Sequence, residues 1–321
     1  MKLISTEEFY NTTHGSLPWI LEPFAVTGST LLLYGRQGIG KSSLAWMLAH
    51  SLTTGVPWLG HHVLKTGPVI YLNLDMPHLE FKQMLERAAA AGMPPTSKIL
   101  MPALGEADAF DVLKSGQGLL DACTTVKPIA LIVDTVADGY LPGSIRDVNA
   151  EVRAVIARFR KMVPDGVLVL MLHDRKRSAF STLEANELDA DAFNGPSAWE
   201  AKATSSFRLT QSKNGVKFHI KKMRLDAPPY TELALKKTEH GFFETPLTPL
   251  LALLGWRGQA ASLTDVFEDV GVQLNTHAEA VKMAYYRAVK KGIKFGWEIG
   301  VTGGPKSGRN NGKSSPQHVT S

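Results

Sequence analysis

The chain is poor in cysteine and in long apolar runs. Cys123 is the single cysteine in 321 residues, so no disulfide framework forms within the chain and a reducing compartment is expected. No uncharged stretch approaches the length that spans a membrane, and the acids Glu7 and Glu8 interrupt the apolar run that a signal peptide needs. Hydrophobic residues still make up 44% of the sequence, which is enough for a packed core. We therefore expect a cytoplasmic protein that makes no contact with a membrane.

Acidic residues are scarce at the C-terminal end. From Lys282 onward, eight Lys and Arg residues stand against one acid, Glu298, which gives this segment a charge of +7. Since the whole chain carries +5, the remainder carries −2. This uneven distribution indicates an anionic partner at the basic end, with nucleic acid the first candidate, or a solvated tail that only aids solubility.

The most specific pattern is a glycine-rich loop between a strand-like run and a helical one. Gly35-Arg36-Gln37-Gly38-Ile39-Gly40-Lys41-Ser42 fits the pattern G-x-x-x-x-G-K-S/T without a gap. Its glycines let the backbone amides wrap around a polyphosphate, while Lys41 reaches the β- and γ-phosphates and Ser42 reaches Mg²⁺. The sequence thus predicts a nucleoside-triphosphate site with nine binding residues: Gly35, Arg36, Gln37, Gly38, Ile39, Gly40, Lys41, Ser42 and Ser43.

Strand-like runs alternate with helical patterns through the first two thirds of the chain. The expected strands are Thr30–Tyr34, Val69–Leu74, Ile99–Pro102, Ile129–Asp134 and Val167–Leu172. The expected helices are Ser42–Ser51, His78–Ala91, Gly118–Thr124 and Val148–Met162. This alternation predicts an α/β fold with a doubly wound, mostly parallel sheet.

The pattern changes after Trp199. We expect antiparallel strands at Ser206–Gln211, Val216–Lys222 and Thr231–Lys236, the first two joined by a hairpin turn at Asn214-Gly215. A further turn leads into Phe242-Phe243, and Pro246 and Pro249 mark a boundary. The late strands are predicted to extend the parallel sheet.

A small helical module is expected beyond this boundary, at residues 250–301. It has helical patterns at Ser262–Val270 and Thr276–Lys291 and a strand at Ile293–Ile299, which fit a winged helix-turn-helix or a packing cap equally well. The composition from Thr302 onward is typical of disorder. The predicted organisation is an ATPase domain at 1–246 with a lead-in at 1–25, the module at 250–301, and a disordered basic tail at 302–321.

A second acid completes the nucleotide motif. The apolar run Ile129–Asp134 ends in a carboxylate, which suits a strand that carries Asp134 to a bound Mg²⁺, although an acid at a strand end can also cap a turn.

The order of these motifs resembles that of the RecA-like P-loop ATPases over residues Leu17 to Lys236. It is most similar to the RepA-type hexameric helicases of plasmids and phages, with DnaB-like helicases as more distant relatives. Thr54-Gly55-Val56-Pro57-Trp58-Leu59-Gly60 is similar to the G-x-P-x-L-G segment of RepA-like proteins. The resemblance implies ATP and Mg²⁺ as cofactors, a homo-oligomeric, hexameric ring that hydrolyses ATP at its subunit interfaces, and single-stranded DNA as partner.

The resemblance also assigns roles to residues at later strand ends. Asp75 stands where the family has a Glu that polarises the attacking water, and the shorter side chain puts the speed of hydrolysis in question. His173 stands where relatives sense the γ-phosphate. Lys222 and Arg224 resemble the K-x-R element that a neighbouring subunit inserts, with Arg224 as its tip. A turn-forming acid, a hydrogen-bonded loop histidine and surface cations remain the alternatives.

The polar stretch from Asp174 to Pro196 corresponds to the DNA-gripping loop of RecA-like helicases. Arg175, Lys176 and Arg177 suit phosphate contacts, but four later acids oppose them: Glu184, Glu187, Asp189 and Asp191. The predicted function is an ATP-dependent helicase or translocase of the replication type. The alternative is a nucleotide-gated DNA-binding regulator, or a recombination or replication mediator, with slow ATP hydrolysis.

Overall fold

The structure is a computed structural model that divides into two compact units. It describes residues 3–12, 17–103, 116–135, 167–175, 198–213, 215–225, 230–244, 262–274 and 276–290, together with 156–157, 159–161, 163–164, 228, 253 and 260. One unit is Trp19–Pro246, and the other combines Met1–Pro18 with Leu247–Ser321.

The described part of the larger unit holds a nine-stranded sheet in the order β11-β10-β9-β8-β3-β7-β6-β4-β5. The strands β3 (Thr30–Arg36), β4 (Val69–Asn73), β5 (Ile99–Leu100), β6 (Ala130–Asp134), β7 (Leu168–Arg175) and β8 (Ser205–Ser212) run parallel. The strands β9 (Gly215–Met223), β10 (Glu232–Lys237) and β11 (Phe243–Glu244) continue it antiparallel. The predicted α/β class and the antiparallel extension are confirmed.

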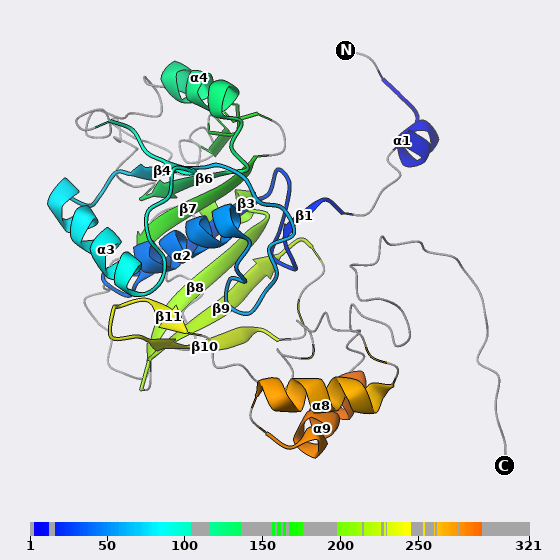
Figure 1. Ribbon diagram of the computed structural model, residues 1–321. Coiled ribbons are helices and arrows are strands. Elements are labelled where there is room, and N and C mark those ends of the chain that lie inside the picture. Colours follow the sequence, from blue (N-terminus) through cyan, green and yellow to red (C-terminus); the bar gives the residue numbers. More distant parts are fainter. Residues whose placement is uncertain are drawn as a thin grey trace, which may run out of the picture. The chain divides into compact units, whose positions relative to one another are not determined.

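Helices cover both faces of the parallel strands, which is why β3, β4 and β6 are apolar along most of their length. The helix α2 (Lys41–Thr54) contacts β3, β4, β6 and β7, and beside it lies α3 (His78–Ala90), whose Phe81 meets Tyr71 of β4 (Figure 1). On the opposite face, α4 (Gly116–Val126) packs Leu119 and Cys123 into a cluster with Leu131 and Val133. Successive residues of one strand therefore enter different cores.

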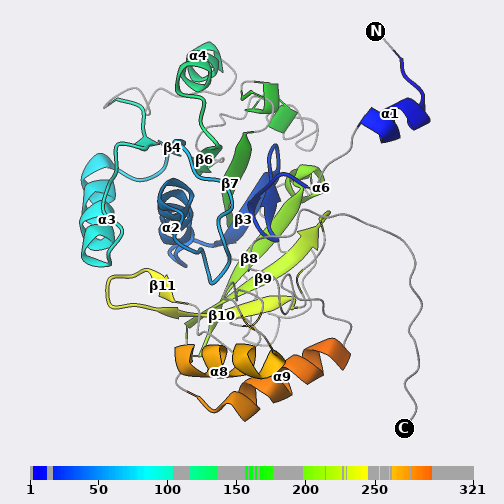
Figure 2. The same cartoon turned by 45° about the vertical axis from the view of Figure 1, so that its right-hand side comes forward.

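The twist of the sheet brings distant segments together. Although β11 and β5 lie at opposite edges of the sheet, both views show the β10–β11 hairpin folded back beneath α2 and α3 (Figures 1 and 2). The carboxyl ends of the parallel strands therefore face α3 and this hairpin across a shared space.

Four short elements were not predicted from the sequence. These are α1 (Thr6–Thr12), β1 (Trp19–Leu21), β2 (Ala25–Val26) and α6 (Ala198–Lys202). The pair β1–β2 forms its own two-stranded sheet, and the Phe24 ring between them lies edge-on to Trp58, Phe207 and Phe218. Tertiary aromatic packing, rather than local propensity, holds this segment.

Several expected boundaries were wrong. The strand β7 does not stop at Leu172 but continues to Arg175, because it pairs with β3 as far as Arg36. Asp174 and Arg175 therefore belong to a strand and not to the following loop. The expected turn at Asn214-Gly215 is also wrong at Gly215, because Gly215 pairs with Ser212 and is the first residue of β9. Pro102 lies outside β5.

The smaller unit contains two packed helices, α8 (Leu263–Gln273) and α9 (Ala278–Lys290). A capping box at Ser262 and Asp265 begins α8, and Phe267 and Val270 of α8 pack with Val281 of α9. The expected strand Ile293–Ile299, the basic tail and most of Val148–Met162 lie outside the described residues. Within the part of the chain that is described, no helix is both long enough and apolar enough to cross a membrane.

Candidate nucleotide site

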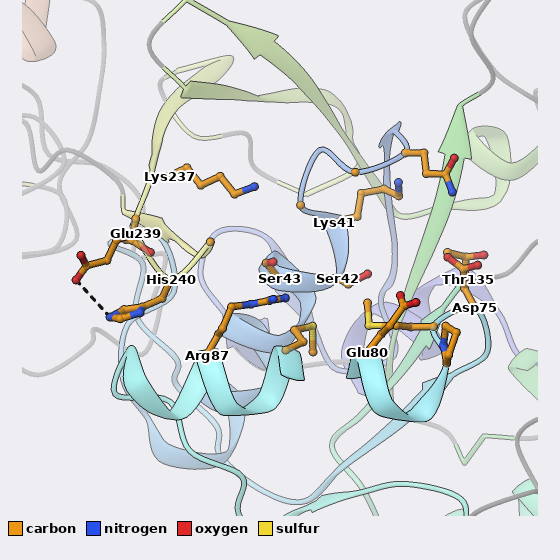
Figure 3. Close-up of a pocket in the computed structure, with 18 residues that line it drawn as sticks. Lys41, Ser42, Ser43, Asp75, Glu80, Arg87, Thr135, Lys237, Glu239 and His240 are labelled. Atoms are coloured by element: carbon orange, nitrogen blue, oxygen red, sulfur yellow. Dashed lines mark ion pairs between the residues drawn. The ribbon is translucent and has the colours of Figure 1, made fainter. Parts of the chain in front are cut away.

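A cavity of about 810 Å³ opens at the carboxyl ends of the parallel strands (Figure 3). Four segments far apart in the sequence line it: the glycine-rich loop with the start of α2, the segment from β4 into α3, the residue after β6, and the β10–β11 turn. The lining residues are Gln37, Gly38, Gly40, Lys41, Ser42, Ser43, Asp75, Met76, Pro77, Glu80, Met84, Arg87, Thr135, Lys237, Thr238, Glu239, His240 and Gly241.

The glycine-rich loop adopts a backbone conformation that favours glycine. Gly38 has φ of 74° and Gly40 has φ of 109°, both in the left-handed region. Gly40 is also the N-cap of α2 and makes no side-chain cap. Because the first N–H groups of a helix lack intrahelical acceptors, this loop aims a cluster of donors into the cavity, where a phosphate would accept them.

Lys41 is held close to the loop from which it extends. Its side chain is buried, with Nζ 3.3 Å from the carbonyl oxygen of Gly35 and 3.2 Å from that of Arg36. These contacts fix the ammonium group at the mouth of the loop. A cation in that position is placed to bind phosphate oxygens held by the same loop.

Asp134 ends β6, close enough to Ser42 and Lys41 for both to act on its carboxylate. Its Oδ2 accepts a hydrogen bond of 2.7 Å from the hydroxyl of Tyr71. Its Oδ1 is buried and has no hydrogen-bond partner among the described residues. Burial raises the pKa of Asp134 to about 6, against the opposing effects of the Tyr71 and Ser42 hydroxyls and of Lys41.

The unsatisfied oxygen of Asp134 tests whether a metal fits this site. A buried carboxylate oxygen without a partner is costly unless a ligand satisfies it. A Mg²⁺ ion or its water shell beside Ser42 supplies what Oδ1 lacks, and hard oxygen donors are the ligands that Mg²⁺ prefers. The residues present therefore fit a magnesium ion that is bound together with phosphates.

Asp75 lies at the same end of the cavity as Thr135, which follows Asp134 in the chain (Figure 3). The turn that carries it is held by Asn73, whose side-chain amide donates to the carbonyl of Met76 at 2.7 Å and whose Oδ1 accepts from the Met76 N–H at 3.2 Å. Leu74 N donates to the carbonyl of Asp134 at 2.6 Å. Asn73 thus forms the turn, and the Asp75 carboxylate lines the cavity.

The predicted binding residues separate into two groups. Gln37, Gly38, Gly40, Lys41, Ser42 and Ser43 line the cavity, whereas Gly35, Arg36 and Ile39 do not. Gly35 instead allows close packing of β3 on β8, since a Cβ there would lie 2.9 Å from the carbonyl oxygen of Leu209.

The predicted sensor and DNA-binding residues lie in β7 or directly after it in the chain. The backbone of His173 pairs with that of Tyr34, which places it beside the strand that enters the glycine-rich loop. Arg175 pairs in the same way with Arg36. Lys176 and Arg177 lie outside the described residues.

Lys222 and Arg224 lie away from the cavity of their own chain, at the end of α6. The Lys222 ammonium donates to the carbonyls of Glu200 and Ala201 at 2.7 and 2.9 Å, and the Arg224 guanidinium donates to Ala201 at 3.0 Å. Burial and the adjacent Arg224 lower the pKa of Lys222. A role for this pair at a γ-phosphate therefore requires the site of a second subunit.

Sequence patterns did not predict the cavity residues that come from α3 and from the β10–β11 turn. Arg87 and Met84 reach it from α3, and the turn Lys237–Gly241 reaches it from the β10–β11 hairpin. Arg87 is the residue that helical periodicity could have found, since it follows Glu80 by two turns on the same face. No local signal connects Lys237 to a loop two hundred residues earlier.

Comparison with known proteins assigns the fold and a family profile. The profile of a family described as an AAA domain (AAA_25) matches residues 2–179, more than half of the chain. The ATPase domain of G40P is similar in structure, with a TM-score of 0.54 at 16% identity over 74% of this chain and 95% of that one.

Two further proteins are similar over part of their length. A DnaB-like replicative helicase, solved to study its interactions with primase, gives a TM-score of 0.52 at 17% identity over 68% of this chain and 57% of that one. A formamidopyrimidine-DNA glycosylase of Nostoc sp. strain PCC 7120 is 42% identical over 65 residues, which are 18% of this chain and 22% of the glycosylase. This chain thus spans about a fifth of that curated relative. The structural likenesses confirm the predicted RecA-like P-loop ATPase fold.

Proposed function

Because the chain belongs to the AAA domain family AAA_25, we propose that it is an ATP-driven motor on nucleic acid, a ring-forming helicase or translocase of the replication type. The observation that carries the ATPase part is the convergence of Lys41, Ser42 and the unsatisfied Oδ1 of Asp134 beside a loop of phosphate-binding amides. Similarity in fold to the ATPase domain of G40P and to a DnaB-like replicative helicase supports the motor part.

Each residue has a defined part in this function. The glycine-rich loop and Lys41 would hold the β- and γ-phosphates, and Ser42 and Asp134 would hold Mg²⁺. When bound, Mg²⁺ supplies positive charge that neutralises the phosphate oxygens. Asp75 accepts a proton from the attacking water while the water oxygen bonds to the γ-phosphorus. The bond between the γ-phosphorus and the β-phosphate oxygen breaks, which leaves ADP and phosphate.

The second subunit completes the site in this proposal. Arg224, with Lys222 beside it, would give up its hydrogen bond to the carbonyl of Ala201 and contact the γ-phosphate of a nucleotide bound to the neighbouring subunit. A cation that arrives only on assembly stabilises transition-state charge and connects hydrolysis to subunit contact. Single-stranded DNA would occupy the ring channel, with Arg175, Lys176 and Arg177 as phosphate contacts and His173 reporting the γ-phosphate to them.

Hydrolysis and assembly together test this function. ATP turnover is measured for the full chain with and without single-stranded DNA, and particle size is measured with and without nucleotide. We expect turnover that rises with DNA in a multi-subunit particle, and loss of turnover in Lys41→Ala. A monomer whose ATPase activity ignores both DNA and RNA would rule out the motor.

A nucleotide-gated DNA-binding regulator is the second candidate, and Asp75 is the observation that favours it. A carboxylate one methylene shorter than Glu positions water less well, which slows hydrolysis and suits a switch. The two candidates differ in strand unwinding. A motor separates strands with ATP, whereas a regulator binds DNA with nucleotide and leaves the duplex intact.

A further inference from the structure

The β10–β11 hairpin is anchored directly on the glycine-rich loop. A Cβ atom at Gly40 would lie 2.5 Å from Cζ of Phe243, so the phenyl ring of β11 fills the space that the glycine leaves. Phe243 itself is buried. Because the ring contacts the N-cap of α2, the hairpin and the phosphate-binding amides keep a fixed separation.

The turn of this hairpin is internally bonded. Thr238 N donates to the carbonyl of Phe242 at 2.8 Å, Gly241 N donates to the carbonyl of Thr238 at 3.0 Å, and the backbone of Lys237 pairs with that of Phe243. Gly241 takes φ of 84°, which closes the turn. The position of Lys237, the last residue of β10, is therefore determined by the same packing that positions Gly40.

Asp75 and Lys237 lie at opposite ends of the cavity (Figure 3). Asp75 and Thr135 lie at one end beside Ser42, and Lys237 and His240 lie at the other, beyond Ser43 (Figure 3). The Lys237 side chain extends from the hairpin toward the loop, and the Arg87 side chain extends from α3 toward Ser43. The ion pair within the turn joins Glu239 to His240, with Oε1 3.5 Å from Nε2. Lys237 thus adds a positive charge at the end far from Asp75.

The proposed roles of Lys41, Asp75 and Asp134 set how a nucleotide would lie. A triphosphate with its γ-phosphate at Asp75 and Asp134 extends along the amides of Lys41, Ser42 and Ser43, which brings its α-phosphate toward the hairpin. Resting on the proposed nucleotide function, we propose that Lys237 is a further nucleotide-binding residue, which binds the α-phosphate from within the same subunit. It therefore recognises the diphosphate part that ATP and ADP share, not the γ-phosphate.

The neighbouring lysine provides a matched control. Lys236 precedes Lys237 in β10, is exposed like it, and does not line the cavity. Because successive strand residues point to opposite faces, Lys236→Met removes the same charge and stem on the other side of the strand.

The test measures equilibrium binding of ADP and of a non-hydrolysable ATP analogue to the full-length chain. A charge-assisted bond to phosphate is worth roughly tenfold in affinity. We expect Lys237→Met to weaken both ligands about tenfold and by the same factor, Lys237→Arg to bind nearly as the wild type does, and Lys236→Met to be unchanged.

Three results would overturn the inference. Loss of affinity for the ATP analogue alone would place Lys237 at the γ-phosphate. Wild-type affinity for both ligands in Lys237→Met would leave Lys237 with no part in binding, although the nucleotide site itself would stand. Failure of the wild type to bind either ligand, with Lys41→Ala indistinguishable from it, would overturn this inference and the proposed function together.

Discussion

Asp134 is the residue at which stability and function oppose each other most directly. In the folded chain its pKa is about 6, against an ordinary value of 3.8, because burial disfavours the charged carboxylate. A raised carboxylate pKa means that the folded state binds the proton more tightly than the unfolded state does. Its contribution to stability is therefore most favourable below about pH 4 and is lost as the pH rises from about 4 to about 6.

The change Asp134→Asn tests this sign. At pH 8 without Mg²⁺, the variant should be more stable than the wild type by about 1–3 kcal/mol, since Asn stays neutral and still accepts from Tyr71. The advantage should shrink as the pH falls toward 5, and stabilisation by Mg²⁺ and ATP should be lost. Denaturant unfolding at both pH values measures it, with the exposed Asp121→Asn as the control. A destabilised Asn variant at pH 8 would contradict the argument.

Asp75 is the residue that we propose sets the speed of hydrolysis. If its carboxylate accepts the proton of the attacking water, Asp75→Glu brings the oxygen closer and should raise kcat by about tenfold, because a shift of about 1 Å carries large rate factors. KM should change little, and Asp75→Asn should remove most turnover. Steady-state ATP hydrolysis measures both. Equal kcat values in the three proteins would assign Asp75 to the turn alone.

Among the elements, α8 has the most clearly defined beginning. Ser262 Oγ accepts from Asp265 N at 3.3 Å, and Asp265 Oδ2 accepts from Ser262 N at 2.7 Å, which satisfies two donors at the helix start. The change Ser262→Ala should weaken the helix by about 1 kcal/mol. Amide exchange in residues 263–273 should quicken about fivefold, while the exposed Thr264→Ala on the same turn leaves it unchanged. Unaltered exchange in Ser262→Ala would show that packing on α9 alone holds the helix.

Element type was predictable where one signal dominated. The buried strands β3, β4 and β6 are continuous apolar runs, and α2 follows directly from the loop that caps it. Strand ends were less predictable, because pairing sets them: β7 continues through the polar pair Asp174 and Arg175 only because β3 lies beside it. The strands β1 and β2 are too short for any periodicity to indicate them.

Only the part of the candidate site that is formed by short continuous segments was predictable. The loop residues follow from a motif whose spacing is set by the chemistry of phosphate binding, and Asp134 follows from an apolar run that ends in an acid. The Tyr71–Asp134 hydrogen bond needs the adjacency of β4 and β6, and the contact of Phe243 with Gly40 needs the twist of the whole sheet. Such contacts join residues far apart in sequence, so no local spacing encodes them.

At the scale of the assembled molecule, the position of Arg224 means that its proposed role requires contact between two subunits. In a single chain the guanidinium donates to Ala201 and lies away from the cavity, so its proposed role needs one chain to supply Arg224 to another chain's Lys41. Arg224→Ala should then lower kcat at least a hundredfold while nucleotide affinity stays near that of the wild type. Retained affinity also serves as the control for folding.

Mixing two inactive variants tests the exchange between subunits. Lys41→Ala has a defective nucleotide loop but still offers Arg224, and Arg224→Ala has an intact loop but no arginine to offer. In a mixed ring, an interface that combines the loop of the second with the arginine of the first is complete. Turnover should therefore rise above that of either variant alone, and peak near equal proportions. A mixture that only averages the two inactive proteins would mean that each chain hydrolyses ATP with its own residues, and that Arg224 acts by holding the end of α6.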